Sequence, residues 1–197
     1  MTFRLLFLCV PLAVFLTACA GEPLPPQRFP EIRFIEEPPI RLDVESIQVV
    51  DTFQPSFKPP EIEYEFPVPP QRALAALATD RFLPTAPGSG RLARFTIEDA
   101  TVRESELPRK EGVEGAFTIE QAERYDGSVA VLLEIIDPNG LAIRTAAAKA
   151  VSSRSVAEDI TPDERDQVWY EMSRELARSL DRELERQIDA SFYPYRR

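Results

Sequence analysis

The sequence predicts an α+β domain, a four-stranded and mostly antiparallel sheet with two helices in the order β-α-β-β-β-α, preceded by a signal peptide and a proline-rich tether. Segments with apolar residues at alternate positions predict the strands, and two segments with apolar residues at helical spacing predict the helices. The turn Asp137-Pro138-Asn139-Gly140 predicts a hairpin between the last two strands, because proline presets the turn and Asn-Gly tolerates positive φ.

The first 18 residues have the pattern of a signal peptide. Arg4 gives a short positive region, and residues 5–16 are apolar. An apolar stretch of about a dozen residues is too short to cross roughly 30 Å of hydrocarbon as a helix. It has the length of a signal core, so we expect residues 1–18 to be removed.

The sequence Leu16-Thr17-Ala18-Cys19 resembles the lipobox of bacterial lipoproteins. The resemblance implies that Leu16, Thr17 and Ala18 are recognised by the signal peptidase, and that Cys19 becomes the N-terminus and carries acyl chains such as palmitate. Similarity to enterobacterial sorting, in which an aspartate after the cysteine favours the inner membrane, makes Ala20 imply an outer-membrane anchor facing the periplasm. The alternative is an ordinary secretory signal with a cysteine at this position by chance.

The composition excludes several kinds of chemistry. The chain has no histidine, and Cys9 and Cys19 are its only cysteines, so the mature domain has no thiol, no disulfide and no histidine or thiolate metal site. We therefore expect no metal and no cofactor beyond the acyl chains. The net charge is −10, and removal of Arg4, which carries +1, leaves −11. A surface this acidic repels nucleic acid and anionic lipid, so membrane contact should come from the anchor.

Residues 19–39 are predicted to be the lipidated cysteine and a tether. Residues 20–39 contain six prolines, and twenty residues of extended, proline-rich chain would reach roughly 60 Å. This predicts a spacer between the membrane and the domain. The alternative is that the apolar residues of this segment dock on the domain or on a partner; they are Phe29, Ile32, Phe34 and Ile35.

The domain is predicted to cover residues 40–192, followed by a tail over 193–197. Its first strand covers residues 40–49, and a change of phase predicts a bulge near Glu45-Ser46. A helix is predicted over residues 71–82, because Pro70 opens it and Pro84 ends it.

Between this strand and helix, Glu61, Glu63 and Glu65 alternate with apolar residues in a proline-rich segment. The pattern predicts an extended segment whose carboxylates form a solvated edge that discourages edge pairing. Three carboxylates on one side could alternatively attract a divalent cation.

The remaining strands are predicted over residues 93–102, 129–136 and 141–151. The first of these changes phase at Glu98-Asp99, an acidic pair to which we assign a structural role. The second is apolar on both faces and is therefore expected to be central. The last is rich in alanine, whose small side chain lets a helix approach the sheet closely.

The final helix is predicted to begin with a capping box of Thr161 and Glu164 and to end near Ser191. Its length of roughly 45 Å exceeds the roughly 33 Å of a ten-residue strand, so we expect it to overhang the sheet. Four pairs of opposite charge at i,i+3 are expected along its solvent side: Glu171–Arg174, Glu175–Arg178, Arg182–Glu185 and Glu183–Arg186.

Three aromatic residues, Phe192, Tyr193 and Tyr195, follow this helix. Either they fold back onto the core, or they form a docking surface for a partner. Phe192→Ser and Tyr195→Ser would distinguish the two, since only core aromatics stabilise the fold.

The element order over residues 40–192 resembles the small α+β domains of periplasmic lipoproteins, such as auxiliary lipoproteins of ABC-type transporters and the lipopolysaccharide-assembly lipoprotein. No motif residues match, so no functional residue is transferred. The expected function is a non-enzymatic lipoprotein that is a scaffold or accessory subunit of an envelope assembly or transport complex. The alternative is a carrier of lipid or another apolar ligand, which needs an apolar groove on the sheet face opposite the helices, near Leu132 and Ile136.

Overall fold

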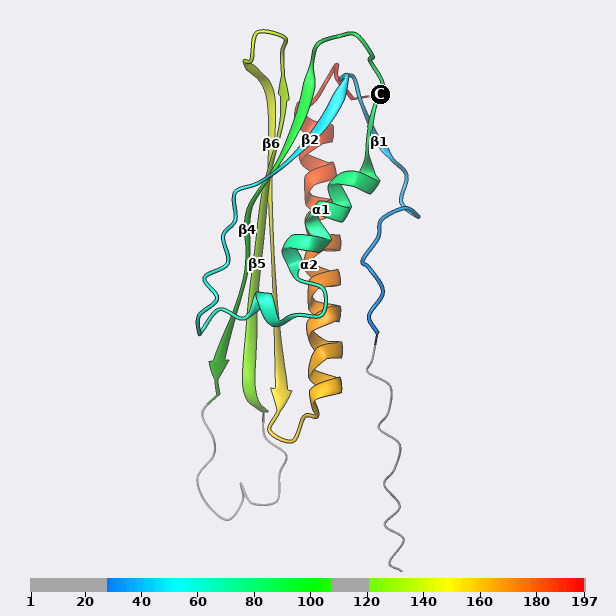
Figure 1. Ribbon diagram of the computed structural model, residues 1–197. Helices are drawn as coiled ribbons and strands as arrows, with labels where there is room; N and C mark the ends of the chain where they lie inside the picture. The colour runs from blue at the N-terminus through cyan, green and yellow to red at the C-terminus, as the bar shows by residue number, and fades with distance from the viewer. Residues whose placement is uncertain (1–27, 108–120, 197) are drawn as a thin grey trace, which may run out of the picture.

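The computed structural model describes residues 28–107 and 121–196, and it places two helices against one face of a four-stranded sheet (Figure 1). The strand order is β2-β4-β5-β6. β2 (Ser46–Asp51) runs parallel to β4 (Leu92–Glu106), whereas β5 (Gln121–Ile136) is antiparallel to both β4 and β6 (Ala142–Ala157). The predicted α+β class and mostly antiparallel sheet are confirmed, and so is the central position of β5.

The predicted first strand is wrong as a single element. The chain bends over residues 43–45, so that β1 (Ile40–Leu42) leaves the main sheet and pairs in parallel with β3 (Phe82–Pro84). Arg91 holds the bend: its Nε donates to the Asp43 carbonyl at 2.9 Å, and its Nη2 contacts the Asp43 carboxylate at 2.7 Å. The phase change near Glu45-Ser46 therefore marks the end of one strand and the start of another, not a bulge within one.

The segment of alternating glutamates is a 3₁₀ turn, η1 (Glu63–Glu65), rather than an extended edge. β4 continues beyond the end of β2, and the segment before η1 pairs with its free edge through the Ile62 N–H and the Val102 carbonyl at 2.9 Å. Glu63 is 1% exposed, and its carboxylate accepts a hydrogen bond from the Val102 N–H at 3.2 Å. The predicted solvated row is thus wrong for Glu63, which turns inward to satisfy an edge amide.

Both predicted helices are present. α1 (Pro70–Arg81) begins one residue before the predicted start, and α2 (Pro162–Ser191) has the predicted capping box. The Thr161 hydroxyl accepts from the Glu164 N–H at 3.3 Å, and the Glu164 carboxylate accepts from the Thr161 N–H at 2.9 Å. None of the helices in the described part of the chain combines the length and the apolar character needed to cross a bilayer.

The predicted overhang of the last helix is wrong, because the strands are longer than expected. β4, β5 and β6 contain 15, 16 and 16 residues, which corresponds to about 50 Å, whereas the 30 residues of α2 extend about 45 Å. The hydrophobic pattern did not predict this length, because the ends of the strands carry polar residues. Arginine, serine and glutamate occupy the solvent-facing positions there, while Tyr125 and Val156 still enter the core.

The core lies between the sheet and the helices. On α2, Met172, Leu176, Leu180, Leu184 and Ile188 are fully buried. They pack over small residues of the sheet, which include Gly127 of β5 and the buried alanines 146, 148 and 150 of β6. The predicted role of the alanine-rich strand is confirmed.

Candidate interaction surfaces

The predicted lipidation site, Cys19, and the recognition residues Leu16, Thr17 and Ala18 lie outside the described residues. Part of the predicted tether, residues 28–39, is within the described residues. Residues 28–39 pack along the two helices, with Ile32 3% and Phe34 2% exposed (Figure 1). Phe29 contacts Tyr170 of α2, with ring centroids 5.1 Å apart. The alternative in which this segment docks on the domain therefore holds for Phe29, Ile32 and Phe34, while Ile35 is 70% exposed.

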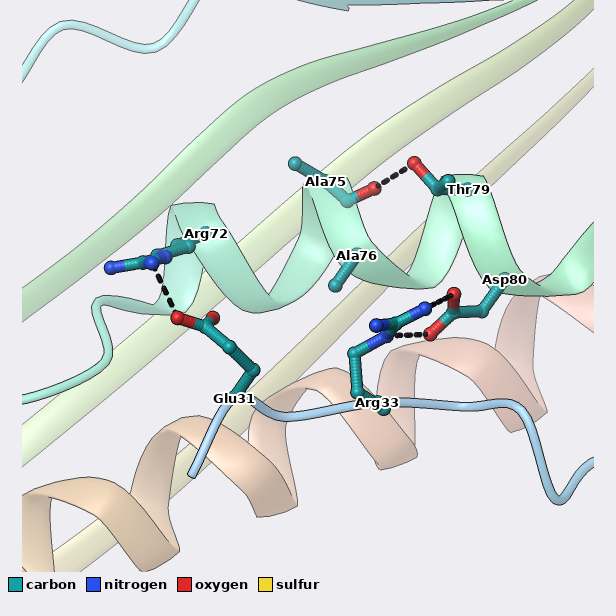
Figure 2. Close-up of a pocket in the computed structure, with 7 residues that line it drawn as sticks. All are labelled: Glu31, Arg33, Arg72, Ala75, Ala76, Thr79 and Asp80. Carbon is teal, nitrogen blue, oxygen red and sulfur yellow. Dashed lines mark hydrogen bonds and ion pairs between the residues drawn. The ribbon is translucent and has the colours of Figure 1, made fainter. Parts of the chain in front are cut away.

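A shallow hollow of about 370 Å³ lies where this segment crosses α1. Figure 2 shows Ala76 of α1 between the two ion pairs that join the segment to the helix, and Ala75 also lines the hollow. One pair is Arg72 with Glu31, and the other is Arg33 with Asp80, in which Nε and Nη2 donate to the two carboxylate oxygens at 2.8 and 2.7 Å. The two pairs fasten the segment at both ends of the hollow, so this site is a structural clamp.

Within this clamp, Asp80 is a buried carboxylate that accepts hydrogen bonds from Arg33 and from the Phe34 N–H. Its side chain is 3% exposed, whereas that of Arg33 is 53% exposed. Hydrogen bonds from Arg33, together with one from the Phe34 N–H at 2.9 Å, hold the pKa of the Asp80 carboxyl below its ordinary value. The carboxylate therefore binds the segment most strongly in its charged form.

A buried arginine connects the same segment to α2. Arg81 is 2% exposed, and its Nε donates to Asp181 at 2.9 and 3.1 Å. Its Nη2 contacts Glu185 at 2.9 Å, and its Nη1 donates to the Pro38 carbonyl. Burial raises the pKa of the Asp181 carboxyl, although the Arg81 guanidinium acts in the opposite direction. Sequence reasoning missed this network, because nothing in the sequence pairs residues so far apart.

The three C-terminal aromatics do not form a common partner surface. Phe192 is fully buried in the core, where it cannot contact a partner, and Tyr195 is half-buried between Arg91 and Arg144, each 5.5 Å from its ring centroid. Tyr193 alone is open to solvent, at 83% exposure. The helix ends at Ser191, so the chain turns back and carries the flanking aromatics onto the core.

Within the acidic pair Glu98-Asp99, Asp99 has the structural role predicted for the pair. The register of β4 shifts between Ile97 and Asp99, and Asp99 accepts hydrogen bonds from the hydroxyls of Thr101 at 2.6 Å and Ser128 at 2.7 Å. Within residues 28–107 and 121–196, no three acidic residues are placed to hold a metal ion.

The exposed sheet face, opposite the helices, carries charged and polar side chains along the strands on which the carrier hypothesis needs an apolar groove. Arg94 faces Glu134 at 3.7 Å on this side, and further along the same strands the Ser128 hydroxyl donates a hydrogen bond to Asp99. Leu132 is only half-buried there, and Ile136 is 4% exposed. The part of this face that the structure describes therefore offers no apolar groove at these two residues.

A second hollow, of about 270 Å³, lies between β6 and α2. Four arginines and two glutamates line it: Arg154, Arg174, Arg178, Arg182, Glu171 and Glu175. This excess of positive charge is unusual in a chain of net charge −10.

Two of the four helical ion pairs predicted for α2 are confirmed and two are wrong. Glu171–Arg174 and Glu183–Arg186 form as expected. Glu175 instead pairs with Arg154 of β6, and Glu185 pairs with Arg81 and Arg196. Both glutamates thus pair with arginines outside α2 instead of with Arg178 and Arg182.

Comparison with known proteins gives only remote similarity. No protein-family model matches the sequence, and no curated protein matches it. Uncharacterized lipoprotein B from Nitrosomonas europaea is similar in structure, with 9% identity, 76% of this chain and 86% of that chain covered, and a TM-score of 0.43. A minor lipoprotein from Acinetobacter baumannii has 12% identity, with 74% and 93% covered and a TM-score of 0.40. Because both TM-scores lie below 0.5, these similarities carry no argument about function.

Proposed function

We propose that this chain is a lipid-anchored, non-enzymatic lipoprotein of the bacterial envelope, held on the periplasmic side of the outer membrane. In this role it is a scaffold or accessory subunit of an assembly or transport complex. The observation that carries the proposal is the sequence Leu16-Thr17-Ala18-Cys19 directly after an apolar segment of signal-peptide length.

The docked segment supports a position close to the membrane. Residues 28–39 pack along the helices, so the connection between the proposed lipidated cysteine and the domain is no longer than residues 20–27. Eight residues span less than about 30 Å even when fully extended. In this proposal the spacer is shorter than the roughly 60 Å expected for residues 20–39, and two or three acyl chains on Cys19, which suffice for stable anchoring, hold the domain near the lipid surface.

No observation favours the two other classes of function. A carrier needs the apolar groove that the exposed sheet face does not provide at Leu132 and Ile136. An enzyme would have to work without histidine or thiol, and Asp99 of the acidic pair Glu98-Asp99 accepts local hydrogen bonds. A scaffold requires only a rigid domain, an anchor and a docking surface.

Metabolic labelling with a palmitate analogue tests the anchor. We expect the wild-type chain to take up label and to fractionate with the outer membrane, and Cys19→Ala to lose both label and membrane association. A wild-type chain that is cleaved but never labelled would show that it is a soluble secreted protein, and the proposal would then be wrong.

Crosslinking in intact cells tests the scaffold role. Capture of the anchored chain after crosslinking should enrich one dominant envelope protein, and Cys19→Ala should lose it because the domain is no longer held at the membrane. Equal recovery of many proteins, or of none, would contradict a scaffold function.

A further inference from the structure

Among the described residues, β6 is an edge strand whose outer side is unpaired for most of its length. It is the last strand of the sheet, and β5 pairs with only one of its two sides. Ser191 reaches the outer side at one end, where its hydroxyl donates to the Thr145 carbonyl at 3.4 Å. Beyond Thr145, no described segment hydrogen-bonds to the outer side before the carbonyl of Ala157.

The orientation of Thr145 shows which amides face outward. Peptide groups alternate along a strand, so odd-numbered residues after Thr145 direct their N–H and C=O groups away from β5. Val151 is one of these, and it is 71% exposed. A row of unpaired backbone groups of this kind is a template for an additional strand.

The hollow beside this edge contains two arginines without carboxylate partners. Arg178 and Arg182 are exposed, and the glutamates expected to pair with them are held by Arg154, Arg81 and Arg196. Among the described residues, Arg182 contacts the Ser179 hydroxyl at 3.0 Å and Arg178 forms no ion pair. Within residues 28–107 and 121–196, Arg178 and Arg182 thus have no carboxylate partner and lie in the hollow that adjoins the edge strand β6.

A second copy of this chain fits the edge poorly. β6 carries Arg144, Lys149 and Arg154 and no acidic residue. An antiparallel pair centred on Lys149 would place Arg144 of one copy opposite Arg154 of the other and Lys149 opposite itself. Parallel in-register pairing also aligns like charges, and like charges directly opposite each other are destabilising. The charge pattern that disfavours a second β6 in these registers favours a strand of opposite charge.

We propose that the outer edge of β6 and the arginines of the adjacent hollow bind an extended acidic segment of a partner protein by strand addition. This inference rests on the proposed scaffold function, because it names the surface and the chemistry of the partner. The backbone of β6 supplies hydrogen bonds, and Arg178 and Arg182 supply specificity for carboxylates through charge-assisted contacts.

Fluorescence anisotropy with the full-length chain in detergent tests the surface directly. The probe is a labelled synthetic peptide in which valine and glutamate alternate, compared with one in which lysine replaces glutamate. We expect saturable binding of the glutamate peptide only. The double variant Arg178→Glu, Arg182→Glu should weaken binding by at least about tenfold, which corresponds to about 1.4 kcal/mol. Arg41→Glu, an exposed charge reversal on β1, is the control and should have no effect.

The contribution of the strand edge is tested separately. Val151→Pro removes one outward N–H at a position where an edge strand tolerates proline, so the chain should fold and bind the peptide at least about tenfold more weakly. Full binding by a folded Val151→Pro variant, equal binding of the lysine peptide, or displacement of the glutamate peptide by an equal concentration of inorganic phosphate would each overturn strand addition.

Crosslinking in cells separates this inference from the proposed function. If the partner captured by the wild-type chain is lost with Arg178→Glu, Arg182→Glu and kept with Arg41→Glu, the surface is the one described. If the partner is captured equally by all variants, the scaffold function stands and this surface is wrong. If the wild-type chain captures no partner, the proposed function fails.

Discussion

At the scale of single residues, Gly127 sets the distance between α2 and the sheet. A Cβ at this position would lie 2.7 Å from Met172 Cε and 2.8 Å from Leu176 Cδ1, both on fully buried side chains. We expect Gly127→Ala to lower the free energy of unfolding by about 1–3 kcal/mol, because the core has no space for the methyl group. Urea denaturation measures this change.

A double-mutant cycle identifies the cause. In a Met172→Ala background the nearest of these contacts is absent, so Gly127→Ala should cost less there than in the wild-type chain. An equal cost in both backgrounds would show that the backbone conformation, and not the contact with α2, requires glycine.

Asp80 makes the docking of residues 28–39 dependent on pH. Its pKa in the folded chain is lowered by Arg33 and the Phe34 N–H, so the stability it contributes is present above its unfolded pKa of 3.8 and lost as pH falls through the folded pKa. Asp80→Asn should cost about 1–3 kcal/mol near neutral pH, and the difference from wild type should shrink at about pH 3. Urea denaturation at the two pH values measures it, and a difference that stays constant would contradict the assignment.

Among the elements, the segment over residues 28–39 is an integral part of the domain rather than a spacer. Phe34 is 2% exposed and its neighbour Ile35 is 70% exposed, which provides a matched pair of variants. Phe34→Ala should lower the free energy of unfolding by about 3–5 kcal/mol, whereas Ile35→Ala should change it by less than about 0.5 kcal/mol. Thermal unfolding followed by circular dichroism compares them, and equal melting temperatures would show that the segment does not dock.

The C-terminal turn after α2 offers a second matched pair. Phe192 is fully buried and Tyr193 is 83% exposed. Phe192→Ser should destabilise the fold by at least about 3 kcal/mol, because an aromatic ring is removed from the core, and Tyr193→Ser should be nearly neutral. Chemical denaturation of both variants is the measurement. A Phe192→Ser variant as stable as the wild-type chain would contradict the core role of Phe192 and would support the aromatic docking surface instead.

At the scale of the whole molecule, the proposed anchor at Cys19 precedes the docked segment by at most eight residues, which limits how far the domain can extend from the membrane. Trp169, the single tryptophan of the chain, precedes Tyr170, which Phe29 contacts where the chain enters the domain. We expect energy transfer from Trp169 to dansyl-labelled headgroups in vesicles that carry the lipidated chain. Insertion of about twenty Gly/Ser residues before residue 28 adds roughly 25 Å and should lower the transfer.

The same insertion after the C-terminus is the control, because it leaves the connection to the membrane unchanged. Transfer that does not depend on the length of the connection would show that the surface of the domain itself, and not the tether, contacts the lipid.

Local features of the fold were predictable from the sequence. The capping box of Thr161 and Glu164 and the turn at Asp137-Gly140 depend on residues within a few positions of each other, and both form as predicted. The bend over residues 43–45 was not predictable, because it depends on Arg91, 48 residues away from Asp43. The ion pairs of Glu175 with Arg154 and of Glu185 with Arg81 were missed for the same reason. Each glutamate has a possible arginine partner on the helix itself, but it pairs with an arginine outside the helix.

The sequence by itself determined the class of the fold, the central strand and the two helices, because hydrophobic period, turn chemistry and capping act over short distances, whereas the lipid anchor stays a prediction. Only the tertiary structure decided where residues 28–39 lie, which aromatics are buried and which arginines remain without a carboxylate. These outcomes depend on competition between partners distant in the chain, and only the packed fold brings such partners within reach of one another.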